Sequence, residues 1–422
     1  MMELFIDERG KVKAAYLRIM TSNLQALRSA NIPCKGSQVN YVTNIVANDI
    51  STHILATSSD HSITIYDYNT LKLLNTFKAH LNTINDIKQF DNSFTWLSCA
   101  SDKTLRRWDT RINNTNTTTS NNIIHKIKNE ILSFDISLNN TLLSLTNGNS
   151  IDFLDLRMIS SNSNNNTSFP STNIPQNTLE SYEDIHTDII TQLQFTPYDP
   201  TLLASSSEDG LICIHDTKSV HEDDVTISTM NTDCPVRKFG FFGTTYEGIY
   251  SLSTVETMTL WHSPSAQLLL SYPSIRSDYT IDYLVDCHYY SDTDQLTLLG
   301  GTYEGVGKVI PIRPEISSIL SEYTQSDLNT TLVSNQPVSK IEGEPTLATY
   351  SLNNGHTDVI RCCFNPYTYS QQCNFTQSVN DRYVLHEKGH ISEGSSASVS
   401  NMSNNTYLIT GGEDSKICIW SL

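Results

Sequence analysis

Three widely separated segments of this chain share one spacing of polar and aromatic residues. In each, a Ser or Thr is followed four residues later by Asp, and six residues after that by Trp or His. The three sets are Ser98–Asp102–Trp108, Ser205–Asp209–His215 and Thr410–Asp414–Trp420. A repeated spacing marks an architecture of stacked, similar units. It constrains the fold more than the length of 422 residues, which by itself suggests two or three domains.

Each unit has the pattern of two short strands joined by a tight turn. In the second unit, Leu202–Ser206 is a short, largely apolar strand, Glu208-Asp209-Gly210 is a turn sequence, and Leu211–Ile214 is a second strand. A histidine precedes each of the three units. Two of these histidines begin nearly the same sequence, HTDII at 186–190 and HTDVI at 356–360. The three histidines are His80, His186 and His356.

These residues resemble the WD-repeat family, whose fold is a β-propeller of four-stranded blades. In that family the His, Ser or Thr, Asp and Trp of a blade form a buried chain of hydrogen bonds. Such a chain is physically reasonable, because each buried polar group needs a hydrogen-bond partner. The resemblance implies two complete tetrads and a third in which His replaces Trp. They are His80–Ser98–Asp102–Trp108, His356–Thr410–Asp414–Trp420 and His186–Ser205–Asp209–His215.

Four weaker copies of the unit complete the set. The first keeps Asp60 and has Tyr66 at the Trp position, and the second has Leu154 at the Trp position and no Asp. The third keeps Trp261, with Glu256 one place away from the Asp position. The fourth has Glu304 at the Asp position and Ile310 at the Trp position. We therefore predict an all-β, seven-bladed WD-repeat β-propeller. Because the last blade ends at Leu422 without an outer strand, an N-terminal strand is expected to cover its open edge and close the ring.

The predicted domain organisation is an N-terminal segment followed by one propeller. Residues 1–40 are expected to hold the closing strand and to allow a short helix, since Val12, Ala15, Tyr16, Ile19, Met20, Leu24 and Leu27 fit a helical stripe. Residues 41–422 form the propeller, interrupted by polar inserts at about 158–178, 321–346 and 366–405. Their Asn, Ser and Thr content predicts disordered surface loops, which are more often tolerated expansions than sites.

The composition and net charge limit which partners and which cellular compartment are expected for this protein. The net charge of −18 favours basic or neutral protein partners over direct binding of nucleic acid, although acidity can also serve solubility alone. No apolar run is long enough to span a membrane, and the N-terminus lacks a secretory signal. Nine cysteines, with Cys99, Cys213 and Cys418 inside repeat strands, indicate reduced thiols and a nuclear or, alternatively, cytoplasmic protein.

Two motifs resemble enzyme or metal sites, but their surroundings in the sequence argue against such a role. His386-Glu387-Lys388-Gly389-His390 matches the zinc-protease pattern, but it contains a glycine and lies in a polar insert with no third ligand in view. Cys362-Cys363 are adjacent on a predicted strand, so their side chains should face opposite ways rather than share a metal. The prediction is a protein with no catalytic residues, no metal and no cofactor.

A paired motif offers a more specific interpretation. Asp109-Thr110-Arg111 and Asp155-Leu156-Arg157 both follow the third strand of consecutive blades. This double pattern resembles the box found in substrate receptors of cullin-type ubiquitin ligases, where an exposed Arg offers a fork suited to carboxylates or carbonyls. The alternative is that each Asp and Arg only tie their own turn together.

The function expected from the sequence is a monomeric, non-catalytic scaffold for interactions between proteins. Three stretches, 58–74, 96–111 and 281–312, resemble a narrower group of WD-repeat proteins without an agreed biochemical activity, which implies a nuclear setting but no mechanism. The acidic charge favours Lys- and Arg-rich partners. The second hypothesis is a ubiquitin-ligase receptor that uses Asp109, Arg111, Asp155 and Arg157 to bind an adaptor.

Overall fold

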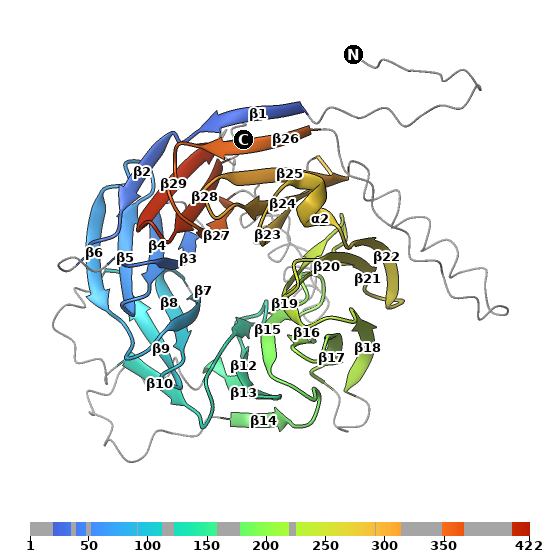
Figure 1. The fold of residues 1–422 in the computed structure, drawn as a ribbon. Coiled ribbons are helices and arrows are strands. Elements are labelled where there is room, and N and C mark those ends of the chain that lie inside the picture. Colours follow the sequence, from blue (N-terminus) through green and yellow to red (C-terminus); the bar gives the residue numbers. More distant parts are fainter. Residues whose placement is uncertain are drawn as a thin grey trace, which may run out of the picture.

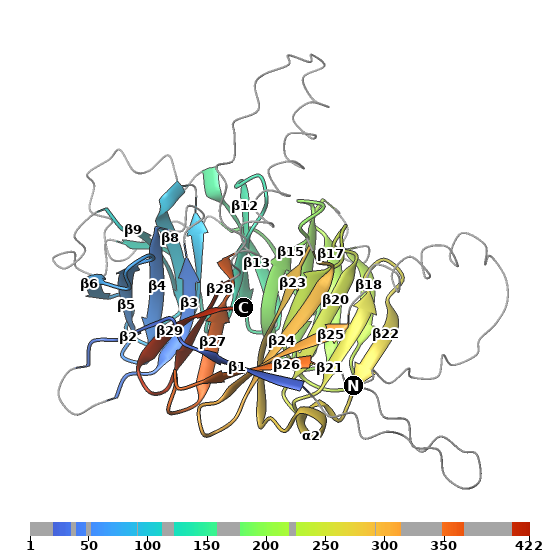
Figure 2. The same cartoon turned by 90° about the horizontal axis from the view of Figure 1, so that it is seen from above.

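Seven β-sheets stand in a ring around a central axis in the computed structural model (Figure 1). The structure describes residues 20–34, 39–47, 52–90, 92–111, 122–157, 178–218, 225–291, 293–313, 348–366 and 407–422. The predicted inserts lie almost entirely outside these residues, as do His386–His390 and the first part of the helical stripe. Figure 2 shows the sheets side by side around the ring, seen at 90° to the first view.

The first four blades follow the chain in order, and each is a four-stranded sheet of which consecutive strands are neighbours. Blade 1 contains β3 (Val42–Ala47), β4 (His53–Ser58), β5 (Ser62–Asp67) and β6 (Leu73–Lys78). Blade 2 contains β7 (Ile84–Phe90), β8 (Asn92–Ala100), β9 (Thr104–Asp109) and β10 (Ile123–Lys126). Blade 3 contains β11 (Phe134–Ile136), β12 (Leu142–Asn147), β13 (Ser150–Asp155) and β14 (Thr178–Tyr182). Blade 4 contains β15 (Ile190–Phe195), β16 (Leu202–Ser207), β17 (Leu211–Asp216) and β18 (Thr226–Asn231).

The last three blades include both N-terminal strands. Blade 5 contains β19 (Val236–Phe242), β20 (Gly248–Ser253), β21 (Met258–His262) and β22 (Gln267–Tyr272), and the short helix α2 (Ile275–Tyr279) follows it. Blade 6 contains β23 (Tyr283–Tyr290), β24 (Gln295–Gly301), β25 (Gly307–Arg313), β26 (Ala348–Asn353) and, outside β26, β1 (Met20–Gln25). Blade 7 contains β27 (Ile360–Phe364), β28 (Tyr407–Gly412), β29 (Lys416–Ser421) and β2 (Arg28–Asn31).

The ring is closed by β2, as the sequence predicts. This strand pairs antiparallel with β29, with Arg28 opposite Ile419 and Asn31 opposite Lys416. Ile32, which follows β2, is 2% exposed and packs into the core between blades 7 and 1. The N-terminal strand therefore supplies the outer edge that the C-terminal strands lack.

A second N-terminal strand, β1, was not predicted. It pairs with β26 in parallel, with Met20 opposite Ala348 and Gln25 opposite Asn353, and so becomes a fifth strand of blade 6 (Figure 1). Met20 and Leu24, which the sequence assigns to a possible helix, lie in this strand. One N-terminal segment thus attaches to two adjacent blades.

The core consists of apolar clusters between neighbouring blades. Each of the seven clusters takes its residues from two adjacent sheets. Between blades 1 and 2, for example, Ile63 and Phe77 pack with Trp96 and Trp108. The sheets are buried on both faces, because every blade has a neighbour on each side. Burial of this kind explains why the second and third strands read as nearly continuous apolar or small residues.

Candidate functional site

The tetrad of blade 2 is a continuous chain of hydrogen bonds. His80 Nδ1 lies 3.1 Å from the carboxylate of Asp102, and His80 Nε2 lies 2.7 Å from Ser98 Oγ. The indole of Trp108 donates to the same Oγ over 2.8 Å. Since the carboxylate can only accept, Nδ1 carries the imidazole proton, and Ser98 donates to Nε2 while it accepts from Trp108. Every member therefore has a partner in the interior of the blade.

In blade 4 a second histidine takes the place of the indole. His186 bridges Asp209 over 3.0 Å and Ser205 over 2.7 Å, as in blade 2. His215 Nε2 lies 2.7 Å from Ser205 Oγ, and its Nδ1 lies 3.1 Å from Thr226 Oγ1. With Ser205 donating to His186, the Nε2–H of His215 is the donor and Thr226 donates to Nδ1. The neutral imidazole thus reproduces the single N–H of tryptophan.

The tetrad of blade 7 repeats the arrangement of blade 2. His356 Nδ1 lies 2.9 Å from Asp414, and His356 Nε2 lies 2.8 Å from Thr410 Oγ1. Trp420, which is fully buried, donates to the same oxygen over 2.8 Å. Although burial opposes the charged carboxylate, the hydrogen bond from His356 lowers the pKa of Asp414 to about 2. The structure therefore brings together all twelve residues of the three tetrads, which brace their blades and leave no reactive group exposed.

The other blades use different contacts at the same positions. In blade 1, Tyr66 occupies the Trp position and donates to the carbonyl of Asn31. It therefore stabilises the closing strand β2 and takes no part in a tetrad with a histidine. In blade 5, Trp261 donates to Thr259 within its own strand over 2.7 Å. Glu256, at a backbone φ of 61°, accepts from the amide of Leu284 in blade 6 over 2.6 Å. Leu154 of blade 3 and Ile310 of blade 6 are fully buried apolar substitutes.

The buried histidines make the stability of the propeller depend on pH. Burial lowers the pKa of His215 to about 3 and lowers the pKa values of His80 and His186 below their ordinary value. A histidine in the unfolded chain has a pKa of about 6.5, so these groups contribute their stability above that pH and lose it as the pH falls. His215 alone should make the free energy of unfolding about 2 kcal/mol lower at pH 5 than at pH 7.5.

We expect denaturant unfolding at pH 7.5 and pH 5.0 to show this loss. In His215→Phe the difference between the two pH values should shrink by about 2 kcal/mol, whatever the substitution costs at neutral pH. An unchanged difference would mean that His215 is not held neutral in the folded blade.

Both Asp-x-Arg motifs form closed pairs at the ends of their strands. Arg111 Nε and Nη2 lie 3.0 Å and 2.6 Å from the two carboxylate oxygens of Asp109. Arg157 contacts Asp155 in the same two-pronged way, at 2.9 Å and 2.8 Å. The side chains of Arg111 and Arg157 are nevertheless 59% and 72% exposed. The carboxylates hold the guanidinium groups in fixed orientations at the surface, where each keeps N–H groups for another acceptor.

The two rims of the ring differ in the segments that they carry. In a sheet of four antiparallel strands, the segment entering the first strand and the turn between the second and third lie at one end. We call this rim the upper face, which contains the loops 183–189 and 354–359 and the turns at 208–210 and 413–415. The third strand ends at the opposite rim, the lower face, where Arg111 and Arg157 lie.

On the upper face, blade 4 carries a concentration of acids. The segments are joined by backbone contacts, with the amide of Glu208 donating to the carbonyl of Ile189 over 3.0 Å. Ile189 is 43% exposed between Asp188 and Glu208, which are both exposed. The exposed acids of this region are Glu183, Asp184, Asp188, Glu208 and Asp233. Large apolar side chains lie exposed elsewhere on the same face, at Leu81, Val255 and Tyr303.

At the inner edges of the sheets, charged side chains of the innermost strands connect successive blades. Lys88 of β7 contacts Asp135 of β11 at 2.8 Å, and Asp135 also accepts from the amide of Phe195 in β15 over 2.6 Å. Lys238 of β19 contacts Asp286 of β23 at 2.5 Å. Although burial opposes its charge, Asp286 helps to raise the pKa of Lys238, so this pair stays ionised. The inner strands are thus tied by ion pairs as well as by the apolar clusters.

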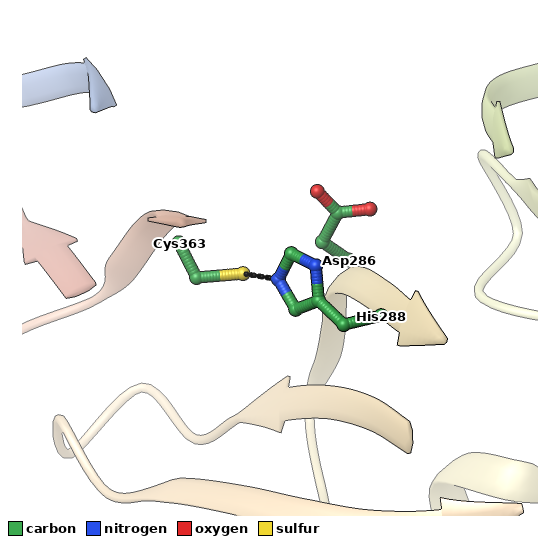
Figure 3. Close-up of side chains that lie close together, drawn as sticks. All are labelled: Asp286, His288 and Cys363. Carbon is green, nitrogen blue, oxygen red and sulfur yellow. Dashed lines mark hydrogen bonds between the residues drawn. The ribbon is translucent and has the colours of Figure 1, made fainter. Parts of the chain in front are cut away.

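Beside that pair lies a group of three side chains that the sequence motifs do not predict. Asp286 and His288 extend from β23 and Cys363 from β27, and their ligand atoms all lie within 4.8 Å of one another (Figure 3). His288 Nε2 is 3.2 Å from Cys363 Sγ. The signal in the sequence is the Asp-x-His spacing, which puts both side chains on one face of a strand. Its partner is 75 positions away, and no local pattern connects them.

The adjacent cysteines do face opposite sides of β27, as predicted from the strand. Cys363 packs in the cluster between blades 6 and 7, whereas Cys362 packs in the cluster between blades 7 and 1 and lies 3.9 Å from the carbonyl of Gly411. A cavity of about 190 Å³ opens next to the three-residue group. Its lining includes Gln192, Lys238, Tyr250, Asp286, His288 and Asn365.

Comparison with known proteins agrees with the geometry. The family described as "WD domain, G-beta repeat" matches residues 71–109, 177–216 and 382–421, which end at the third strands of blades 2, 4 and 7. These are the blades that carry the three tetrads. The chain is therefore a seven-bladed β-propeller that contains WD repeats. Such propellers typically act as scaffolds for interactions between proteins, and the family is generally non-enzymatic.

Among individual proteins, the chain resembles WD repeat-containing protein 89. It is 29% identical to the WD repeat-containing protein 89 homolog of Dictyostelium discoideum over 318 residues, 74% of each chain. It is 27% identical to WD repeat-containing protein GTS1 of Arabidopsis thaliana, over 64% of this chain and 67% of that one. An uncharacterized WD repeat-containing protein of Saccharomyces cerevisiae is 26% identical, over 62% of this chain and 64% of that one. Within its described residues, the chain has no helix long and apolar enough to cross a membrane.

Proposed function

We propose that the protein is a scaffold whose upper face binds Lys- and Arg-rich segments of other proteins. The observation that carries this proposal is the group of exposed acids on blade 4, centred on Asp188 and Glu208. No cation among the described residues forms an ion pair with either of them. Their charges are therefore available to a basic partner, and the exposed Ile189 adds an apolar contact between them.

Blade 7 provides an internal comparison, because its loop and turn have nearly the same sequence. There Glu413, which corresponds to Glu208, is paired with Arg361, and the guanidinium of Arg361 lies 6.0 Å from the centre of the Tyr41 ring. The position of Arg361 is occupied in blade 4 by Thr191, whose hydroxyl donates to the carbonyl of Val236. The acid of the turn is thus paired with a cation in blade 7, whereas Glu208 of blade 4 has no ion pair among the described residues.

The overall charge supports the same partner chemistry. A net charge of −18 attracts a basic segment over distances beyond direct contact and accelerates encounter at low ionic strength. Because exposed charges are screened within about 10 Å at 0.1 M salt, the interaction should weaken as salt is added. The nucleus, rich in basic protein tails, is the compartment that we propose, with the cytoplasm as the alternative; the eight free cysteines among the described residues fit either.

The test is the affinity of the full chain for a fluorescent Lys/Arg-rich peptide in 50 mM salt. Asp188→Asn combined with Glu208→Gln should weaken binding about 5- to 10-fold, equivalent to roughly 1 kcal/mol. Asp358→Asn combined with Glu413→Gln, the matched pair in blade 7, should change it less than about 2-fold. Equal losses in the two variants, or binding that does not respond to salt, would contradict the proposal.

A second function, as substrate receptor of a cullin-type ubiquitin ligase, is favoured by one observation. Arg111 and Arg157 lie at equivalent positions of consecutive blades on the lower face, and both are largely exposed. It ranks second because each Arg already contacts its own Asp through two nitrogen atoms. Recovery of a ligase adaptor that is lost in Arg111→Asp/Arg157→Asp, with binding of the basic peptide intact, would favour this function.

A further inference from the structure

We propose that Asp286, His288 and Cys363 bind a divalent transition-metal ion, best matched by zinc, at the inner seam between blades 6 and 7 (Figure 3). The three side chains offer one carboxylate oxygen, one imidazole nitrogen and one thiol sulfur. This site is independent of the acidic upper face and adds a metal to a protein proposed above only to bind other proteins.

The distances suit a small ion. Zinc binds nitrogen and oxygen at about 2.0–2.2 Å and sulfur at about 2.3 Å, so neighbouring donors of a tetrahedral site lie roughly 3.5 Å apart. His288 Nε2 and Cys363 Sγ are already 3.2 Å apart, and the remaining separations do not exceed 4.8 Å. The longest separation would therefore have to shorten by about 1 Å for the three donors to surround one ion.

The donor set selects the class of metal. Calcium and magnesium take oxygen ligands, whereas a thiolate with an imidazole favours zinc and similar transition metals. Binding forms a metal–sulfur bond and releases the proton of the Cys363 thiol to solvent. Three protein ligands leave a fourth position for water or a donor from a partner, and Asp286 and His288 line the cavity of about 190 Å³ through which either could enter.

The ammonium group of Lys238 already lies beside the proposed ligand Asp286. Its Nζ contacts Asp286 Oδ2 at 2.5 Å, where it neutralises the carboxylate that the metal would use. The side chain of Lys238 is 38% exposed and lines the cavity, so the ammonium group can move aside when an ion enters. Lys238 therefore competes with the metal, and its removal should strengthen metal binding.

The position of the site gives the metal a structural consequence. β23 belongs to blade 6 and β27 to blade 7, the two blades to which β1 and β2 attach at the outer side of the ring (Figure 1). An ion held by both inner strands would join the same two blades at their inner edges. Because the ligands come together only in the folded ring, metal binding should also raise the thermal stability.

The experiment uses the untagged full chain, freed of metal and titrated with Co²⁺ as a spectroscopic stand-in for zinc. We expect one equivalent of Co²⁺ to produce sulfur-to-cobalt charge-transfer absorption. At a free Co²⁺ concentration of about 100 times Kd, Tm should rise by roughly 3 °C. Cys363→Ser should lose this equivalent and this absorption. Cys362→Ser, the adjacent buried cysteine on the opposite side of the strand, should keep both.

Two further outcomes decide the proposal. Lys238→Gln, which leaves all three ligands in place, should bind Co²⁺ several-fold more tightly. Weaker binding in that variant would overturn the assignment of Asp286 as a ligand in competition with Lys238. No charge-transfer absorption in the wild type, or absorption that survives in Cys363→Ser, would overturn the site itself, and unfolding curves of the metal-free variants will exclude misfolding as the cause.

Discussion

A chain that begins at residue 33 is expected to be about 5–8 kcal/mol less stable than one that begins at residue 26. The shorter chain lacks β1, β2 and Ile32, whereas the longer one lacks β1 alone. Without β2, the outer edge of β29 has no partner, Tyr66 loses the carbonyl of Asn31, and the buried side chain of Ile32 leaves a cavity. This loss is comparable to the whole stability of an ordinary domain, which is about 5–15 kcal/mol.

Tryptophan fluorescence during denaturant unfolding will measure the difference, since Trp420 lies on β29. A synthetic peptide of residues 20–32 supplied to the shorter chain should restore part of the lost stability, whereas a peptide of the same composition in scrambled order should not. Equal unfolding midpoints for the two chains would show that β2 does not close the ring.

Trp108→Ala is expected to destabilise the propeller by about 3–5 kcal/mol, through a large cavity between blades 1 and 2. Trp108→Phe keeps most of the volume and removes the hydrogen bond to Ser98 Oγ, which leaves buried polar groups with one partner fewer. Its expected cost is about 1–3 kcal/mol. The difference between the two substitutions separates packing from hydrogen bonding in the tetrad.

Trp96 is the matched control, because it lies directly opposite Trp108 in the register of β8 and β9. It is 1% exposed, and its indole N–H has no hydrogen-bond partner among the residues that the structure describes. Trp96→Phe therefore removes an unsatisfied donor along with some volume, and should cost less than Trp108→Phe. Unfolding free energies of the three variants will test this order, and a larger loss for Trp96→Phe would contradict the role assigned to the tetrad.

The repeat made most of the fold predictable from the sequence. The tetrads combine residues a few positions apart with one preceding histidine, and the nearly continuous apolar or small residues of the second and third strands indicate burial on both faces. The closing strand followed from a general need, since an open sheet edge must be covered. In contrast, β1 lacks a regular apolar alternation in MTSNLQ, and nothing local in it specifies parallel pairing with β26.

The group at the inner seam could not be predicted for a related reason. Asp286 and His288 share a strand, but Cys363 approaches them only because blades 6 and 7 are neighbours at their inner edges. Glu256 shows the same limit, because its position suggests a shifted tetrad acid and its carboxylate instead reaches the backbone of the next blade. Contacts within a blade follow from spacing, whereas contacts between blades need the ring.

The pairing of β2 with β29 also has a consequence for how the protein is made. Arg28 meets Ile419, so nearly the whole chain separates the two strands. At roughly 5–20 residues per second, a ribosome needs about 20–80 s to synthesise what lies between them. During that time β2 has no sheet to join, and the six earlier blades remain an open arc. Closure is therefore a late, long-range folding step of this protein, at which an unpaired N-terminal segment is most exposed to chaperones, to proteases and to strands of other chains.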